Sequence, residues 1–356
     1  MRKESFEFLK ELLTVPGPSG FEAPAQKVWC EYARQFADEV TTDAYGNAVA
    51  VLNPGHGPKI LLDAHMDEIA LMVKYIDEKG FIYFQRIGGV DPALVRNKRV
   101  NIHTDNGTVR GVIGATAIHL QDRSKGEQKK VPKMHEIFID VGAADGEAAK
   151  ELVSVGDPIT FDDEFEMLND NIGVARMFDN RGGCWTVIEA LRIAKEAGLE
   201  CSLYACSSIQ EETGLNGAQM QAVAVQPDAA IAVDVTHATD TPGISMQQHG
   251  EVFLGKGPTV SLGRENHPGL TARVREIAKQ KEVDLQLETF SITGGTDAYA
   301  YWTKNGGVPS MIVSIPNRYM HSCVEMVDLR DLQATADLLA GLVSDIKKDE
   351  TFAVKV

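Results

Sequence analysis

Residues 60–68 read Ile-Leu-Leu-Asp-Ala-His-Met-Asp-Glu, and the fold of the chain can be worked out from this stretch. Its start, Ile60–Leu62, is a short continuous apolar run, which is typical of a strand buried on both faces of a sheet. The run ends at His65, where side chains of metal-ligand type begin. In open α/β sheets, ligands bind beyond the carboxyl ends of the strands. We therefore expect a buried strand that delivers His65 to a ligand crevice.

The chain after Asp179 alternates between helical and strand patterns. The expected helices cover residues 184–195, 217–223, 270–277, 298–304 and 332–346. The expected strands cover residues 203–209, 230–235, 285–290 and 311–315. Such alternation predicts an α/β layer architecture, and two amphipathic patterns near the N-terminus add further helices.

Between these two regions, from about residue 74 to residue 164, the pattern changes. Short alternating segments are separated by Gly, Asn-Gly and Pro signals, at residues 80–87, 98–104, 107–113, 135–141 and 157–161. They predict a small β-barrel or β-sandwich inserted into the chain. We expect residues 1–71 and 164–356 to form one discontinuous catalytic domain and residues 72–163 an inserted β domain that serves oligomerisation. The larger domain would then need only a short link in place of the insertion.

The charge and cysteine content exclude several kinds of partner. Among 356 residues, 35 Lys and Arg face 51 Asp and Glu, for a net charge of −16. This field repels phosphate backbones and anionic lipid headgroups, so we expect neither nucleic acid nor membrane as partner. No apolar run approaches the ~18 residues of a spanning helix, and the charged N-terminus is unlike a signal peptide. Five scattered cysteines in apolar contexts indicate reduced thiols, and we expect a cytoplasmic protein.

Side chains of metal-ligand type recur where the expected strands end. The motifs are Asp63–Glu68, Phe178–Arg181, Gln210–Gly214, Val233–His237 and Tyr319–Ser322. If they converge, they bring together four carboxylates, those of Asp179, Glu211, Glu212 and Asp234, which cannot all ionise without compensation. Two divalent cations would supply it, and two-metal hydrolases hold their ions about 3.5 to 4 Å apart.

Two pairs within these motifs suggest a division of labour. In His65-x-Asp67, a ligating imidazole can give its second N–H to Asp67, which we expect on the same strand face. Glu211 and Glu212 would diverge from an extended segment, so that one can bind metal and the other can act as general base. A His-x-Asp pair alone is more often a surface or core pair than a metal site, and a lone Glu-Glu pair is almost always part of a solvated face. Asp240 or His237 could also be the ligand in place of Asp234, although the apolar run before Asp234 favours Asp234.

The motifs together resemble those of the tetrahedral metallo-aminopeptidases of metallopeptidase family forty-two. The resemblance covers nearly the whole chain and runs through Pro18–Glu22, His65–Glu68, Asp179–Arg181, Gln210–Glu212, Asp234–Thr236 and Arg318–Ser322. It implies a three-layer α/β/α dizinc catalytic domain with a small inserted β-barrel. It also implies peptide substrates with a free N-terminus, two zinc or cobalt ions, and dimers that assemble into a dodecamer.

The same resemblance implies a role for each site residue. His65 and Asp234 hold one metal, Glu212 and His321 hold the other, and Asp179 bridges both. Glu211 is the general base. Asp67 is the second catalytic residue and supports the metal ligand His65. We also expect Asp297, which follows Gly-Gly-Thr, to line the substrate pocket.

Three other functions compete with an aminopeptidase. A dinuclear carboxypeptidase or deacylase of the related clan shares the His-x-Asp and Glu-Glu pairs, but there the extra domain follows the last carboxylate ligand. Here the long β-rich gap lies between His65 and Asp179. A glycoside hydrolase has two carboxyl groups about 5 to 9.5 Å apart and no use for ligating histidines. A metal-binding scaffold would not need the spare base Glu211.

Overall fold

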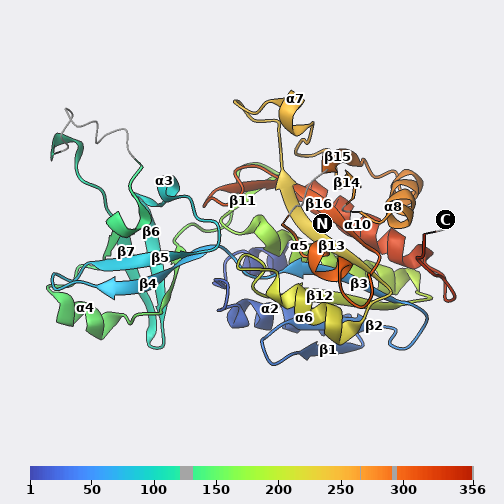
Figure 1. Cartoon of the computed structure of the whole chain (residues 1–356), viewed down its shortest axis with the longest axis horizontal. Coiled ribbons are helices and arrows are strands. Elements are labelled where there is room, and N and C mark those ends of the chain that lie inside the picture. Colours follow the sequence, from blue (N-terminus) through green and yellow to red (C-terminus); the bar gives the residue numbers. More distant parts are fainter. Residues whose placement is uncertain (121–130, 265, 291–294, 355–356) are drawn as a thin grey trace.

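The computed structural model describes residues 1–120, 131–264, 266–290 and 295–354. Figure 1 shows a larger part built around an eight-stranded sheet and, beside it, a smaller part built around a closed barrel. The expected α/β architecture with an inserted β-barrel is confirmed.

Four parallel strands form the centre of the large sheet. Its order is β1-β2-β12-β3-β13-β16-β14-β15, in which β12, β3, β13 and β16 run parallel. These four are β12 (Ser202–Ser208), β3 (Lys59–His65), β13 (Ala229–His237) and β16 (Ser310–Asn317). The outer strands are β1 (Glu39–Thr42), β2 (Ala48–Leu52), β14 (Thr259–Gly263) and β15 (Gln286–Phe290). Because the central strands are parallel, their carboxyl ends meet at one edge of the sheet.

Helices cover both faces of this sheet and complete three layers. Consecutive side chains of a strand point to opposite faces, so Leu62 joins one apolar core and Leu61 the other. The first core is covered by α1 (Lys3–Leu12), α2 (Ala23–Ala33), α5 (Phe178–Ala197), α8 (Pro268–Gln280) and α10 (Leu329–Asp345). The second is covered by α6 (Asn216–Val225) and α9 (Ala298–Trp302).

The smaller part is a barrel with a core of its own. Its strands close in the order β4-β5-β8-β7-β6-β9, around a separate apolar cluster that includes Ile82, Ile102 and Ile159. They are β4 (Ala70–Ile76), β5 (Ile82–Ile87), β6 (Arg99–Thr104), β7 (Gly107–Ile113), β8 (Phe138–Asp140) and β9 (Pro158–Phe161). The strand pattern in the sequence is compatible with either a barrel or a sandwich. The pairing of β4 with β9 closes the sheet and shows that it is a barrel.

Several short elements were not expected from the sequence. They are α3 (Pro92–Val95), α4 (Gly146–Leu152), α7 (Met246–His249), β10 (Glu166–Met167), β11 (Ile172–Ala175), β17 (Glu325–Asp328) and the 3₁₀ turns Ile118–Leu120 and Met134–Glu136. In Figure 1, α7 projects from the large part on an extended arm. Strands β10, β11 and β17 form a small second sheet that carries Glu325 near the site.

Two further observations concern the chemistry of the chain as a whole. All five cysteines are buried and unpaired, as their apolar contexts indicated. Among the described residues, none of the helices combines the length and the apolar character that crossing a lipid bilayer requires.

Candidate active site

His65 is the last residue of β3, and its ring is held from behind. Its Nδ1 lies 3.2 Å from the carbonyl oxygen of Asp67 and 3.4 Å from the Asp67 carboxylate. A carbonyl oxygen only accepts, so Nδ1 carries the proton and Nε2 faces the crevice as a free ligand atom. The expectation that Asp67 shares a strand face with His65 is wrong, because β3 ends at His65 and Asp67 lies beyond it.

Asp67 has a second role that the sequence did not indicate. Its carboxylate accepts hydrogen bonds from the backbone N–H groups of Glu211 and Glu212, at 2.9 and 3.1 Å. The two glutamates therefore lie on a turn that Asp67 holds in place. The expectation that they belong to an extended segment is wrong. Gln210 before them has φ 53°, a left-handed conformation that bends the chain after β12. The turn makes the two side chains diverge.

The side chains expected to bind metal form two clusters that share Asp179. His65 Nε2 lies 3.2 Å from one Asp179 oxygen and 3.7 Å from Asp234. His321 Nε2 lies 3.3 Å from the other Asp179 oxygen and 3.2 Å from Glu212. In each cluster the ligand atoms all lie within 4.8 Å of one another. Glu211 belongs to neither cluster, although its carboxylate is 3.8 Å from His65 Nε2.

The charges of this site fit divalent cations. Burial, and then the neighbouring Asp234 and Glu212, raise the pKa of Glu211 to about 9. Hydrogen bonds to Asp179 and Glu212 raise the pKa of His321 to about 11. The protein alone thus gathers excess negative charge and holds protons to balance it. Metal ions would replace those protons, since histidine binds metal in its neutral form.

Hydrogen bonds made by the side chains of Asn180 and Glu325 hold the backbone at Asp179 in place. Asp179 lies in the first turn of α5, where it and Asn180 depart from helical backbone angles and are joined by a cis peptide bond. The Asn180 amide donates to the Val233 carbonyl at 2.7 Å, and the Asp179 N–H donates to Glu325 at 2.8 Å. Glu325 also accepts from the His321 N–H at 2.9 Å, so one buried carboxylate aligns both residues. The sequence analysis missed Glu325, whose only signal is an acidic residue four positions after His321.

The inserted barrel part also reaches the site. The segment between β5 and β6 places the Gly89 carbonyl oxygen 3.2 Å from His321 Nδ1, so this ring also keeps Nε2 free for a ligand role. A side chain at Gly89 would meet the His321 ring at 2.7 Å. Replacing the insertion with a short link would therefore also remove a partner of His321.

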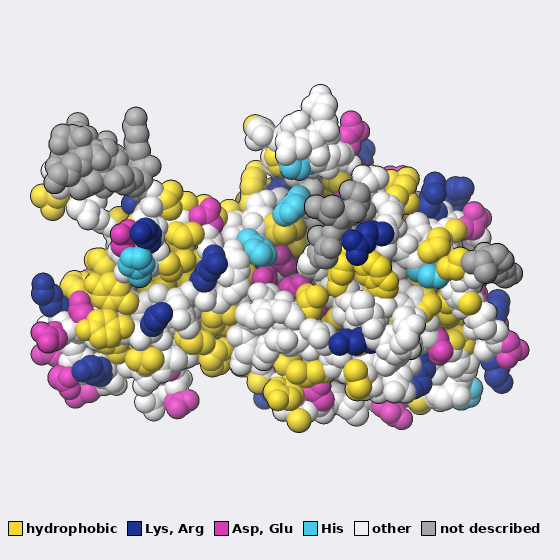
Figure 2. Space-filling model, in the orientation of Figure 1, with side chains coloured by type: hydrophobic (Ala, Val, Ile, Leu, Met, Phe, Trp, Pro, Cys, Tyr) yellow, Lys and Arg dark blue, Asp and Glu magenta, His cyan; other side chains and the backbone are white. Residues whose placement is uncertain are grey.

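The residues of both clusters line a cavity of about 350 Å³. Figure 2 shows acidic side chains with histidines close by near the middle of this face. The lining residues beyond the clusters are Val235, Thr236, His237, Ser261, Glu288, Gly295, Thr296, Ile312, Ser314 and Met320. The described lining contains neither Lys nor Arg.

Three other candidates lie outside the clusters. Asp240 accepts two hydrogen bonds from Arg318, both at 2.7 Å, and so has a structural partner. His237 lines the cavity but is in neither cluster. Asp297, expected to line the pocket, is only 2% exposed and is not among its lining residues.

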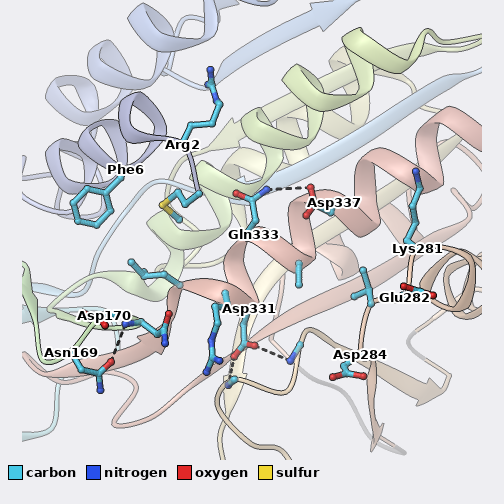
Figure 3. A pocket seen from close by; sticks show the side chains of 18 of the residues that line it. Arg2, Phe6, Asn169, Asp170, Lys281, Glu282, Asp284, Asp331, Gln333 and Asp337 are labelled. Atoms are coloured by element: carbon cyan, nitrogen blue, oxygen red, sulfur yellow. Dashed lines mark hydrogen bonds between the residues drawn. The ribbon is translucent and has the colours of Figure 1, made fainter.

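A larger cavity of about 1150 Å³ lies elsewhere, between α1, α10 and residues 281–284 after α8 (Figure 3). Its buried carboxylate, Asp331, accepts from the backbone N–H groups of Gly255 and Gly257 at 2.7 and 2.8 Å. Gln333 donates to Asp337 across the same wall. The Asp331 bonds brace the loop before β14, and neither metal-ligand cluster lies there.

Comparison with known proteins identifies the family of the chain. The chain matches the M42 glutamyl aminopeptidase family over residues 46–338. It is 34% identical over 346 residues to the lysyl aminopeptidase of Pyrococcus furiosus, with 96% of this chain and 97% of that one covered. A TET aminopeptidase from a marine sediment thaumarchaeon has a TM-score of 0.91 at 33% identity, covering 97% of each chain.

A further solved structure is that of the TET1 peptidase of Pyrococcus horikoshii, which can assemble into a tetrahedron or a large octahedral shell. Its TM-score is 0.86 at 32% identity, with 96% of this chain and all of that chain covered. The protein is thus a hydrolase of the metallo-aminopeptidase class. Within that class, the chain belongs to the M42 peptidase family.

Proposed function

We propose that the protein removes N-terminal residues from peptides and that it uses two bound divalent ions, zinc or cobalt, to do so. His65 and Asp234 would hold one ion, Glu212 and His321 the other, and Asp179 would bridge them. The observation that carries this proposal is that Asp179 presents one oxygen to each histidine, at 3.2 and 3.3 Å. When bound, such ions lower the pKa of water and polarise a scissile carbonyl.

Glu211 is proposed as the general base. It takes a proton from the attacking water and returns it to the leaving amine. Its position supports this role, because it faces the clusters without belonging to either. Burial raises its pKa, which makes the carboxylate a stronger proton acceptor than an exposed glutamate. Asp67 contributes by holding the Glu211 turn and the His65 ring.

The small cavity supports cleavage at a chain end. A cavity of about 350 Å³ is at the lower limit of ligand pockets and suits one residue better than a run of them. The insertion between His65 and Asp179 argues against the related carboxypeptidases and deacylases. The two histidines at carboxylate clusters argue against a glycoside hydrolase, and the unengaged Glu211 argues against a metal-binding scaffold.

We propose that residues 72–163 form the oligomerisation domain and that the subunits assemble as dimers into a dodecamer. The TET1 relative, which forms closed shells, supports a homo-oligomer. Apolar side chains exposed on the barrel part, such as Tyr75 and Val112, give a surface that a second copy could cover. Light scattering should show a particle far larger than the 38.8 kDa chain. A monomer at micromolar concentration would refute this assembly.

The net negative charge and the unpaired cysteines support a cytoplasmic location for the protein.

The test of the activity compares free and blocked N-termini. Zinc- or cobalt-loaded protein should cleave aminoacyl reporter substrates, and N-acetylated versions of the same reporters should not react. A chelator should abolish the hydrolysis, and added metal should restore it. Cleavage of the acetylated reporters, or full activity in the chelator, would contradict the proposal.

A further inference from the structure

Glu288 lines the part of the cavity next to Thr236, and it belongs to neither metal-ligand cluster. It belongs to β15 and pairs across the sheet with Ser261 of β14, and both residues line the cavity. Glu288 is only 9% exposed. A carboxylate built into the wall of a substrate cavity, and outside the residues proposed for the chemistry, needs an explanation of its own.

Three hydroxyl groups hold this carboxylate in one orientation. Thr236 donates to one oxygen at 2.9 Å. Thr259 and Ser261 donate to the other at 2.8 and 3.4 Å. Hydrogen bonds to a carboxylate are charge-assisted and favour its ionised form. The donors come from β13 and β14, so two strands fix the direction of the carboxylate.

The distance from the clusters suits the side chain of a bound first residue. Thr236 follows Asp234 by two positions on β13, so the two point to the same face about 6.6 Å apart. Glu288 contacts Thr236, and it therefore lies about one long side chain away from Asp234. Ile312 and Met320 add apolar surface to the lining, against which an aliphatic stem can pack.

We propose that Glu288 makes the part of the cavity beside Thr236 a subsite for a cationic first residue, lysine or arginine. The inference rests on the proposed aminopeptidase function and names its substrate class. An ammonium or guanidinium group would pair with Glu288 while its stem packs on the apolar lining. A glutamate in the same place would meet a like charge in a described lining without Lys or Arg, so the protein should discriminate against acidic first residues.

The test compares kcat/KM for Lys, Arg, Met and Glu reporters in the wild type and in Glu288→Gln. The wild type should favour Lys and Arg over Met by about 10-fold or more, with Glu slowest. Glu288→Gln keeps the shape, and its amide oxygen can accept from the hydroxyl groups on one side while its NH2 group donates to a hydroxyl oxygen on the other. It should lower the Lys and Arg values about 10- to 100-fold and change the Met value by less than about 3-fold. The control Glu276→Gln, which removes an exposed charge on α8, should leave the profile unchanged.

Two results would overturn the inference. One is a wild type that prefers neutral or acidic first residues. The other is an equal loss for all four reporters in Glu288→Gln at unchanged metal content and melting temperature, which would place Glu288 at the common α-ammonium group or in the framework.

A binding measurement separates this inference from the proposed function. If metal-loaded protein cleaves no reporter, the proposed function fails. Calorimetry with lysine amide and its neutral isostere norleucine amide then still tests the subsite. Tighter binding of lysine amide by the wild type, lost in Glu288→Gln, would support it, and equal binding of the two amides would overturn it.

Discussion

The carbonyl oxygen of Gly89 lies 3.2 Å from Nδ1 of His321, although 231 residues separate the two in the chain. Gly89 follows a barrel strand, whereas His321 follows β16 of the large sheet. The contact fixes the tautomer in which His321 Nε2 faces Asp179 and Glu212. The barrel part therefore contacts a proposed metal ligand directly, in addition to its proposed role in oligomerisation.

Gly89→Ala tests this connection. The new Cβ would meet Nδ1 and Cε1 of His321 at 2.7 and 2.9 Å, so the ring must move. We expect metal affinity at one of the two sites to fall about 10- to 100-fold, the usual effect of disturbing a ligand's supporting partner. Elemental analysis after dialysis measures it. Gly114→Ala is a matched control, since nothing lies within 4 Å of a Cβ there. Two retained ions in Gly89→Ala would show that His321 does not depend on this contact.

Asp179 and His65 should differ in how many ions depend on them. Asp179→Ala removes the side chain common to both clusters, whereas His65→Ala removes a member of one. We therefore expect about two ions lost in the first variant and about one in the second, with circular dichroism showing the fold retained. Equal metal losses in the two variants would mean that Asp179 does not bridge.

Glu211 and Glu212 should separate chemistry from metal binding. Glu211→Gln keeps the shape but removes the basic oxygen, so kcat should fall about 100-fold or more at nearly full metal content. Glu212→Gln instead changes a group 3.2 Å from His321 and should weaken metal binding. Metal titrations and steady-state rates on both variants would reveal an exchange of roles if Glu211→Gln proves the metal-deficient one.

The difference between what the sequence predicts and what it misses follows from the kind of interaction. His65 and Asp234 are readable because an apolar strand leads to a ligand-type side chain, and β3 and β13 lie side by side in the sheet. Gly89 carries no chemical signal, since its contribution is a backbone carbonyl. Glu325 is an ordinary acidic residue until β17 places it under Asp179.

The barrel shows the same limit at the level of the fold. Alternating segments indicate strands, but closure depends on the pairing of Leu71 with Ile159, far apart in the sequence. Local patterns contain no information about that register. The turn of Glu211 and Glu212 was likewise unreadable, because its shape comes from Gln210 and from backbone bonds to Asp67.

Glu22 should make the folded state sensitive to pH near neutrality. One of its oxygens accepts from the N–H groups of Gly20 and Gln210, at 2.7 and 3.1 Å, and so braces the turn before Glu211. Burial raises the pKa of this carboxyl from 4.5 to about 7. The folded state therefore keeps a proton that the unfolded state loses between these values, and its stability falls as the pH rises through that window.

Glu22→Gln should remove this pH dependence, because a glutamine oxygen can accept both bonds and has no proton to lose. The two proteins should be equally stable near pH 4.5, and the variant should be more stable by about 3 kcal/mol at pH 8. Urea unfolding at both pH values, at one protein concentration and metal content, gives the comparison. Glu31→Gln, on the exposed side of α2, serves as the control and should follow the wild type. If Glu22→Gln and the wild type keep a constant difference from pH 4.5 to pH 8, the pKa of Glu22 is not raised by folding and the expected coupling is absent.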